Sequence, residues 1–436
     1  ETKRKPRTMK KRTISKRVKN GLVAALDIGT TKVCCLIGRI TADPGLYRDA
    51  GVKIIGIGHQ VSGGLRSGTV VDLDDAEASI RATVEAAEQM AGENIQGVVV
   101  NVSGGQPLSR LIAYEISIAG HEIGDADLRR ILDPSVLKNG LARERELIHT
   151  IPVGYSIDGN RGVRDPRGMY GERLGVNMHV ISALSGPLRN IETSVQRCHL
   201  GIEDKVVSAY ASGLAALVED EIQLGVTCID MGGGTTSIAV FFDGELVHTD
   251  SIAVGGVHVT NDIARGLSTP LAQAERMKTL YGSALQSSSD DREIIKVPLV
   301  GEDKEADASQ VPRSMLVSII RPRVEETLEM VRDRLKAAGF DKVAGRCVVL
   351  TGGASQLPGV RELAADIIDK QVRMGRPKAI EGLAEAAAGP AFATVTGLLH
   401  YAVNNKAEAP SAAYCPPEEQ AGRRFGRLGQ WLRENF

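Results

Sequence analysis

The sequence lacks any run of about eighteen apolar residues, and its basic N-terminal end is not followed by an apolar signal segment. We therefore expect neither a membrane-spanning helix nor secretion. None of the six cysteines forms a C-x-x-C pair, and most lie in apolar, strand-like runs, which indicates reduced core thiols in a cytosolic protein. The net charge is only −1, so we expect no nucleic-acid partner.

Aromatic residues are also scarce, at 3% of the chain with one tryptophan. Hydrophobic residues as a whole still make up 42% and charged residues 25%, which is typical of a globular protein. A chain of 436 residues can bury large cores and is more typical of two lobes than of one. Composition alone does not indicate the function of the protein, but its sequence motifs do.

Two segments about two hundred residues apart repeat one pattern, a carboxylate followed by a turn rich in glycine and threonine. Apolar stretches flank each turn, so each is typical of the tip of a β-hairpin. Glycines let the backbone approach an anion, and successive N–H groups and threonine hydroxyls can bind it. The residues concerned are Asp27, Gly29, Thr30, Thr31 and Lys32 in the first turn and Asp230, Gly232, Gly233, Gly234, Thr235 and Thr236 in the second.

A single turn of this kind would more simply be a tight hairpin, but two copies favour anion binding. We expect Asp27 and Asp230 to face each other across a cleft. Such a pair suits Mg²⁺, which is usually held by one or two carboxylates together with nucleotide phosphates. A third turn, Gly352-Gly353-Ala354, follows an apolar strand and precedes a helix, where N–H groups favour anions. The three turns in this order predict nucleotide binding.

The two ends of the chain differ from the rest. Residues 1–20 carry ten Lys or Arg against one Glu and form either a solubilising tail or a weak contact with anionic lipid or an acidic partner. Residues 404–421 are rich in proline and alanine and predict a linker. Residues 422–436 predict an amphipathic helix that binds an anionic membrane surface, although docking on its own domain is an alternative. Its membrane-binding residues are Arg423, Arg424, Phe425, Arg427, Leu428, Trp431, Leu432, Arg433 and Phe436.

Over residues 21–436 the chain resembles the actin-like ATPase superfamily and, within it, the FtsA family of bacterial cell-division proteins. The resemblance to the superfamily rests on the phosphate turns, and the resemblance to the FtsA family rests on other stretches. The stretch Gly64-Leu65-Arg66-Ser67-Gly68-Thr69-Val70-Val71-Asp72 carries the second, together with Leu217-Val218-Glu219-Asp220-Glu221 and the closing Trp431-Leu432-Arg433-Glu434-Asn435-Phe436.

The resemblance implies an α/β, actin-like two-lobed fold with duplicated β-rich cores and an α+β insertion in the first lobe. The first-lobe core would comprise residues 21–103 and 181–224, interrupted by an inserted subdomain at 104–180. The second-lobe core would comprise residues 225–269 and 346–382, with an insertion at 270–345. Residues 383–403 would form the closing helix of the first lobe.

The resemblance also implies ATP and Mg²⁺ as cofactors and places Glu275 and Lys278 at the ribose and adenine edge, although spacing alone would fit a surface ion pair. Ser208 stands where related ATPases carry a catalytic acid, so we expect weak or negligible hydrolysis. The implied function is a peripheral protein at the cytoplasmic face of the inner membrane, at the division site. It would form filaments, bind the FtsZ C-terminal tail, tether the FtsZ ring and recruit later division proteins. An ATP-hydrolysing kinase or chaperone-like enzyme is the alternative.

Overall fold

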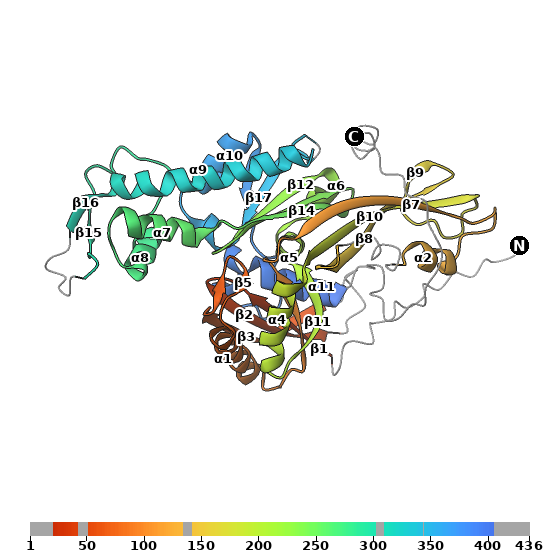
Figure 1. The fold of residues 1–436 in the computed structure, drawn as a ribbon, viewed down its shortest axis with the longest axis horizontal. Helices are drawn as coiled ribbons and strands as arrows, with labels where there is room; N and C mark the ends of the chain where they lie inside the picture. Colours follow the sequence, from red (N-terminus) through yellow and green to blue (C-terminus); the bar gives the residue numbers. More distant parts are fainter. Residues whose placement is uncertain (1–20, 42–50, 134–141, 302–308, 343, 405–436) are drawn as a thin grey trace, which may run out of the picture.

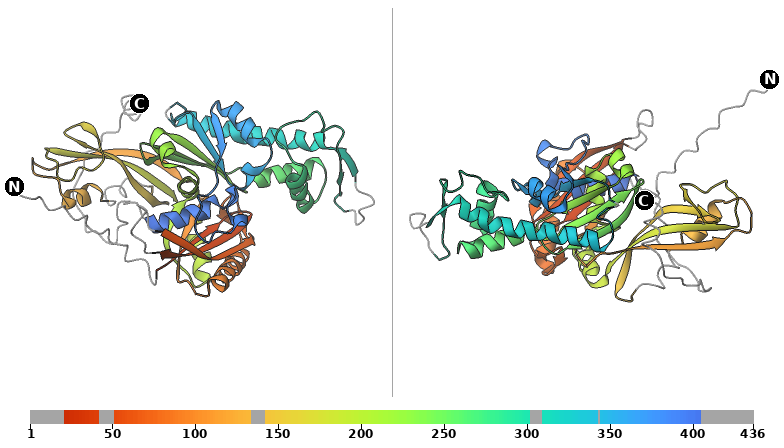
Figure 2. Two further views of the ribbon diagram at one scale, coloured as in Figure 1. Left: turned by 180° about the vertical axis from the view of Figure 1, so that it is seen from behind. Right: turned by 90° about the horizontal axis from the view of Figure 1, so that it is seen from above.

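The computed structural model describes residues 21–41, 51–133, 142–301, 309–342 and 344–404 (Figure 1). These residues form two lobes, each built around a five-stranded sheet. Two further segments project on opposite sides of the lobes, residues 108–184 at one end and residues 271–312 at the other, as the views in Figure 2 also show. The predicted basic tail, linker and membrane helix lie outside the described residues, except for residue 404 at the linker's start.

The two sheets have the same topology. In each, the first strand in chain order pairs antiparallel with the second and parallel with the fourth. The first sheet has the order β11-β6-β1-β2-β3 and contains β1 (Leu22–Ile28), β2 (Lys32–Thr41), β3 (Gly51–Val61), β6 (Gly97–Val102) and β11 (Gly201–Val207). The second has the order β14-β13-β12-β17-β18 and contains β12 (Val226–Met231), β13 (Thr236–Phe242), β14 (Glu245–Ile252), β17 (Cys347–Thr351) and β18 (Gln371–Met374).

Two helices, α5 (Ser208–Ala216) and α11 (Ala393–Asn404), lie between the sheets and share one apolar core with both. They approach closely at Gly397, where an added Cβ would lie 1.7 Å from the Ala211 carbonyl oxygen. Only glycine allows this contact. Helix α11 packs on α5 and β1, and α5 in turn packs on β12 and β13 of the second sheet, so the two helices connect the lobes.

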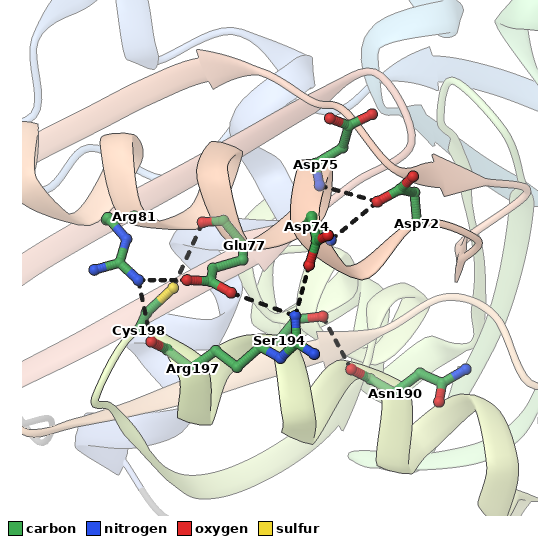
Figure 3. Close-up of polar contacts among 9 residues, drawn as sticks. All are labelled: Asp72, Asp74, Asp75, Glu77, Arg81, Asn190, Ser194, Arg197 and Cys198. Atoms are coloured by element: carbon green, nitrogen blue, oxygen red, sulfur yellow. Dashed lines mark hydrogen bonds and ion pairs between the residues drawn. The ribbon is translucent and has the colours of Figure 1, made fainter.

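The outer face of the first sheet is covered by α1 (Leu73–Ala91) and α4 (Ser185–Arg197). Asp72 caps α1 by accepting hydrogen bonds from the backbone N–H groups of the second and third helical residues at 2.9 and 3.1 Å. Figure 3 shows how polar contacts join the two helices: Arg197 pairs with Asp74 at 2.8 Å, and the Cys198 thiol donates to the Glu77 carbonyl oxygen. Two short strands, β4 (Leu65–Arg66) and β5 (Thr69–Val70), precede α1 and face the second lobe.

The first projecting segment is an α+β unit with its own apolar core. Its sheet has the order β7-β10-β8-β9 and contains β7 (Leu108–Ser117), β8 (Arg145–Ile157), β9 (Asn160–Val163) and β10 (Arg173–Leu184), with α2 (Asp125–Ile131) beside it. The glycine, arginine and proline content of residues 158–175 predicts a loop, and this prediction is wrong, because β9 and the start of β10 lie there. Strand β10 pairs with β7 and β8 over its length, so these partners extend it beyond its apolar run.

The second lobe adds α6 (Glu219–Leu224), α7 (Gly256–Gly266), α8 (Leu271–Tyr281), the strand pair β15 (Ile294–Val297) and β16 (Ser309–Pro312), α9 (Arg313–Ala337) and α10 (Val360–Ile368). Apolar residues at helical spacing predict a helix over residues 321–338, but α9 begins eight residues earlier and contains Pro322. Proline removes a backbone hydrogen bond inside a helix. Here the buried stripe of Leu316, Ile320 and Val324 continues through it, so packing outweighs the lost bond.

Within the described ranges no helix is long and apolar enough to cross a bilayer. The five cysteines that the structure describes are free thiols, and three of them, Cys34, Cys35 and Cys228, are buried. Burial raises the pKa of the Cys34 thiol to about 12. These thiols are therefore apolar core side chains, as predicted.

Candidate functional site

The two glycine-rich turns have the same backbone geometry. The Gly29 N–H donates to the Lys32 carbonyl oxygen at 3.0 Å, and the Gly232 N–H donates to the Thr235 carbonyl oxygen at 2.9 Å. An added Cβ at either glycine would lie within 3.0 Å of that oxygen, at 2.8 Å for Gly29 and 3.0 Å for Gly232. The same tight hairpin is therefore built at the end of the central strand of each sheet.

The two turns lie against each other. An added Cβ on Gly233 would approach the Thr31 side chain at 2.5 Å, and one on Gly234 would approach Thr30 Oγ1 at 2.3 Å. Thr30 Oγ1 also accepts a hydrogen bond from the Gly68 N–H at 3.0 Å. The structure thus brings the two halves of the predicted phosphate site together at the boundary between the lobes.

The two predicted carboxylates are both buried, with Asp27 5% exposed and Asp230 7% exposed. Burial raises the pKa of Asp27 to about 6; the nearby Lys32 ammonium opposes this rise, and Asp230 adds to it. Burial also raises the pKa of Asp230, against the effects of two hydroxyl donors and Lys32. Two carboxylates and one ammonium therefore form a single electrostatic unit, as expected for groups that bind a cation together with an anion.

Asp230 is held by side chains that the sequence analysis did not identify. Its Oδ2 accepts hydrogen bonds from Ser212 Oγ at 2.6 Å and from Thr394 Oγ1 at 3.0 Å. An added Cβ on Gly352, in the third predicted turn, would lie 2.3 Å from Asp230 Oδ1. Ser212 lies four residues after Ser208 on α5, so helical spacing could have pointed to it. No local pattern points to Thr394.

Lys32 lies at the centre of this unit. Its ammonium contacts the Ala391 carbonyl oxygen and lies 4.0 Å from the centre of the Phe392 ring. Both residues lie in the short 3-10 helix, Pro390–Phe392, that directly precedes α11. The cation of the first turn is therefore anchored by the segment that joins the lobes.

The second glycine-rich turn, the third predicted turn and the Glu275–Lys278 pair meet at the start of α7. The Gly256 N–H donates to the Gly232 carbonyl oxygen at 3.0 Å. Lys278 Nζ donates to the Gly256 carbonyl oxygen at 3.1 Å, to Thr260 Oγ1 at 2.9 Å and to Glu275 Oε2 at 2.7 Å. An added Cβ on Gly256 would also lie 3.3 Å from the Ala354 Cβ.

These contacts bring the three predicted turns together with Glu275 and Lys278. Thr236 begins β13 and is fully buried, and its hydroxyl donates to the Val254 carbonyl oxygen, so this side chain supports the turn from behind. Gly353 faces open space, since its nearest neighbour to an added Cβ is the Ala391 Cβ at 3.9 Å. Thr260, which the sequence analysis missed, joins Glu275 to Lys278 through its hydroxyl.

Ser208 lies near the first turn, as its place in the sequence predicted. Its hydroxyl accepts a hydrogen bond from Asn101 Nδ2 at 3.3 Å, and Asn101 Oδ1 accepts one from the Ile28 N–H at 2.7 Å. Ser208 is buried at 5% exposure. A serine hydroxyl is a far weaker base than a carboxylate, so Ser208 cannot take a proton from water as the expected acid would.

The donor set fits a magnesium nucleotide. In the part of the chain that the structure describes, no three or more His, Cys, Asp or Glu side chains cluster as a metal cage. Magnesium needs only one or two carboxylates when phosphates and water supply the other ligands, and Asp27 and Asp230 meet that need. The glycine turns provide the close backbone approach that phosphates require.

Comparison with known proteins is consistent with this geometry. The family model "Cell division protein FtsA" matches residues 227–397, and the model "SHS2 domain inserted in FTSA" matches residues 104–182. The chain is 48% identical to the cell division protein FtsA of Agrobacterium fabrum over 423 residues, covering 95% of each chain. It is 33% identical to that of Escherichia coli K12, covering 95% of this chain and 98% of the relative.

Among solved structures, the chain is similar to the PilM-PilN type IV pilus biogenesis complex, with a TM-score of 0.61. The match covers 87% of this chain and 98% of that chain at 17% identity, which is a likeness of fold alone. Together with the duplicated sheets, it confirms the predicted actin-like, two-lobed α/β fold with an α+β insertion in the first lobe.

Proposed function

This chain belongs to the FtsA family of cell-division proteins, and we propose that it binds Mg²⁺-ATP between its lobes and tethers the FtsZ ring to the membrane. The observation that carries the nucleotide proposal is the meeting of two identical turns, where Asp27, Asp230 and Lys32 interact in a buried setting. Asp27 and Asp230 would hold a magnesium ion there, and its charge would offset the negative charge that burial makes costly.

Each part of the surface has a separate role in this proposal. Asp27 and Asp230 would hold Mg²⁺, and the N–H groups and hydroxyls of residues 29–32 and 232–235 would hold phosphate oxygens. Glu275 and Lys278, fixed by Thr260, would bind the ribose and adenine edge beside Gly352, Gly353 and Ala354. For the lobes and insertions we propose the residue ranges that the resemblance implies.

We expect ATP to be bound with slow or negligible turnover. Ser208 replaces the acid of related ATPases, and its hydroxyl is engaged by Asn101. Titration calorimetry with Mg²⁺-ATP should give one site per chain, and chelation of the metal should weaken binding. A steady-state rate of several turnovers per second would reject the scaffold and favour an ATP-hydrolysing enzyme.

The membrane proposal rests on the sequence pattern of residues 422–436. A short helix with aromatic residues and arginines binds lipid weakly, so assembly of many copies would strengthen attachment through avidity. We propose that the protein lies at the cytoplasmic face of the inner membrane at the division site. Co-sedimentation with anionic liposomes should pellet the full chain but not a chain ending at residue 422. In the full chain, Trp431→Glu should behave like the truncation. Equal pelleting of all three would contradict tethering.

We propose that the second-lobe insertion receives the FtsZ C-terminal tail. Large apolar side chains are exposed there, including Tyr281, Ile294 and Met315, and Arg313 Nε donates to the Tyr281 carbonyl oxygen between them. Exposed apolar patches mark interaction sites. Binding of an FtsZ tail peptide, followed by fluorescence anisotropy, should be lost in Ile294→Glu. The control Leu224→Glu changes an even more exposed apolar residue, on α6, and should bind normally.

The remaining parts of the proposal concern assembly. Copies of the chain would associate into filaments, and the α+β insertion at residues 104–180 would contact neighbouring subunits and later division proteins. Sedimentation of the purified protein with and without Mg²⁺-ATP tests self-association. A chain that stays monomeric on lipid under all nucleotide conditions would remove the avidity on which tethering depends.

A further inference from the structure

A cavity of about 520 Å³ lies between the two lobes, next to the hairpin tips. Thr30 and Gly234 border it where the two turns meet. One wall comes from the β4–β5 segment of the first lobe, and the other comes from α7 and α9 of the second lobe. Its volume is within the range of small-molecule sites.

The charged side chains around this cavity are mainly basic. Arg66 comes from the first lobe, and Arg265 and Arg323 come from the second, together with His258. The one acidic residue of the lining, Asp262, is bound by Arg323 at 2.6 Å. Within the residues that the structure describes, neither Arg66 nor Arg265 forms an ion pair. Two guanidinium groups from opposite walls therefore lack a counter-charge.

The cavity is separate from the predicted ribose and adenine edge. Val257, Asn261 and Arg265 line it at four-residue spacing on one face of α7. Lys278 contacts the same helix at Gly256 and Thr260, each of which lies about 100° around the helix axis from its cavity-lining neighbour, Val257 or Asn261. The two regions therefore lie on different faces of α7, and the cavity also reaches Thr30 and Gly234 at the hairpin tips.

We propose that this cavity is a second oxyanion site, which takes a phosphate-class anion and joins the lobes by binding Arg66 from one side and Arg265 and Arg323 from the other. Guanidinium groups bind phosphate oxygens through paired, charge-assisted hydrogen bonds. The ion pair with Asp262 holds Arg323 in place, and the two unpaired arginines supply the net positive charge. Because the three arginines are outside the candidate nucleotide site, the proposal does not depend on ATP binding.

The test is titration of inorganic phosphate into the full chain, alone and after saturation with Mg²⁺-AMPPNP, at constant ionic strength set with chloride. The wild-type protein should bind phosphate with similar affinity in both conditions. Arg66→Gln and Arg265→Gln should each weaken binding at least tenfold, whereas the exposed Arg361→Gln on α10 should change it less than twofold. Thermal melts without phosphate should coincide, because neither arginine is paired in the fold.

Three results would overturn the inference. The first is the absence of phosphate binding by the wild-type chain. The second is equal phosphate affinity of the wild-type chain and both cavity variants. The third is loss of phosphate binding once AMPPNP is present, which would make the cavity the terminal-phosphate end of the nucleotide site. A failure of AMPPNP to bind would reject the proposed nucleotide function and leave the phosphate titration of the free chain as a separate test.

Discussion

Replacing Asp27 by asparagine should stabilise the nucleotide-free protein at neutral pH. The carboxyl is buried at 5% exposure, and its pKa is raised from 3.8 to about 6. One pKa unit corresponds to about 1.4 kcal/mol, so keeping Asp27 ionised in the fold costs up to roughly 3 kcal/mol above pH 6. Asparagine has nearly the same shape and carries no charge, so Asp27→Asn removes this cost.

The pH dependence follows from the sign of the shift. The folded pKa lies above the unfolded one, so the folded state binds more protons between pH 4 and pH 6. Asp27 therefore makes the protein less stable as the pH rises through that window, and the loss is complete above it. The gain from Asp27→Asn should be near its full size at pH 7.5 and should be small near pH 4.5.

Urea unfolding followed by far-ultraviolet circular dichroism at these two pH values measures the difference. The matched control is Asp230→Asn, because the Asp230 carboxylate accepts hydrogen bonds from Ser212 and Thr394. The asparagine oxygen can accept both bonds, but a neutral oxygen accepts them more weakly than a carboxylate, so this variant should gain less. Mg²⁺-ATP should stabilise the wild-type chain more than Asp27→Asn. A loss of stability in Asp27→Asn at pH 7.5, or a gain independent of pH, would refute the reasoning.

Three other perturbations have defined outcomes. Gly352→Ala should destabilise the fold by more than about 1 kcal/mol in a thermal melt, because Gly352 has φ +87° and its new Cβ would meet Asp230; Gly353→Ala has open space and should melt like wild type. His179→Asn should reduce the fall in the free energy of unfolding below pH 6.5, because burial lowers the pKa of the histidine to about 3 and protonation therefore favours unfolding. Urea titrations at several pH values measure this fall, and an unchanged pH dependence would exclude His179 as its cause. Lys278→Met should weaken Mg²⁺-ADP binding about tenfold by calorimetry, since it removes a charged hydrogen bond; an unchanged affinity would remove Lys278 from the site.

Much of the core could be predicted from local sequence. The strands at residues 97–102, 245–252 and 371–374 can be predicted with these bounds from the sequence, because short apolar runs end there at turn-forming residues. The capping side chain of Asp72 likewise predicts the start of the helix that follows it. Where pairing partners or packing overrode local preference, as at β10 and Pro322, the prediction was incomplete.

The candidate site also combines residues that local motifs identify with residues that only the structure reveals. Asp27 and Asp230 could be identified because each sits in a short motif that occurs twice. Ser212 and Thr394, which hold Asp230, belong to helices far from it in sequence, and nothing local marks their contact. Arg66 and Arg265 could not be identified as cavity residues for a similar reason, because they are far apart in the sequence and come together only in the folded protein.

The sequence alone determined that two similar hairpin turns exist and that each carries an aspartate, because strand, turn and glycine preferences act over a few residues. Only the tertiary structure decided that the two aspartates share one buried environment and that arginines from both lobes surround one cavity. Burial and electrostatic interaction depend on all atoms within several ångströms, and most of those atoms come from distant parts of the chain.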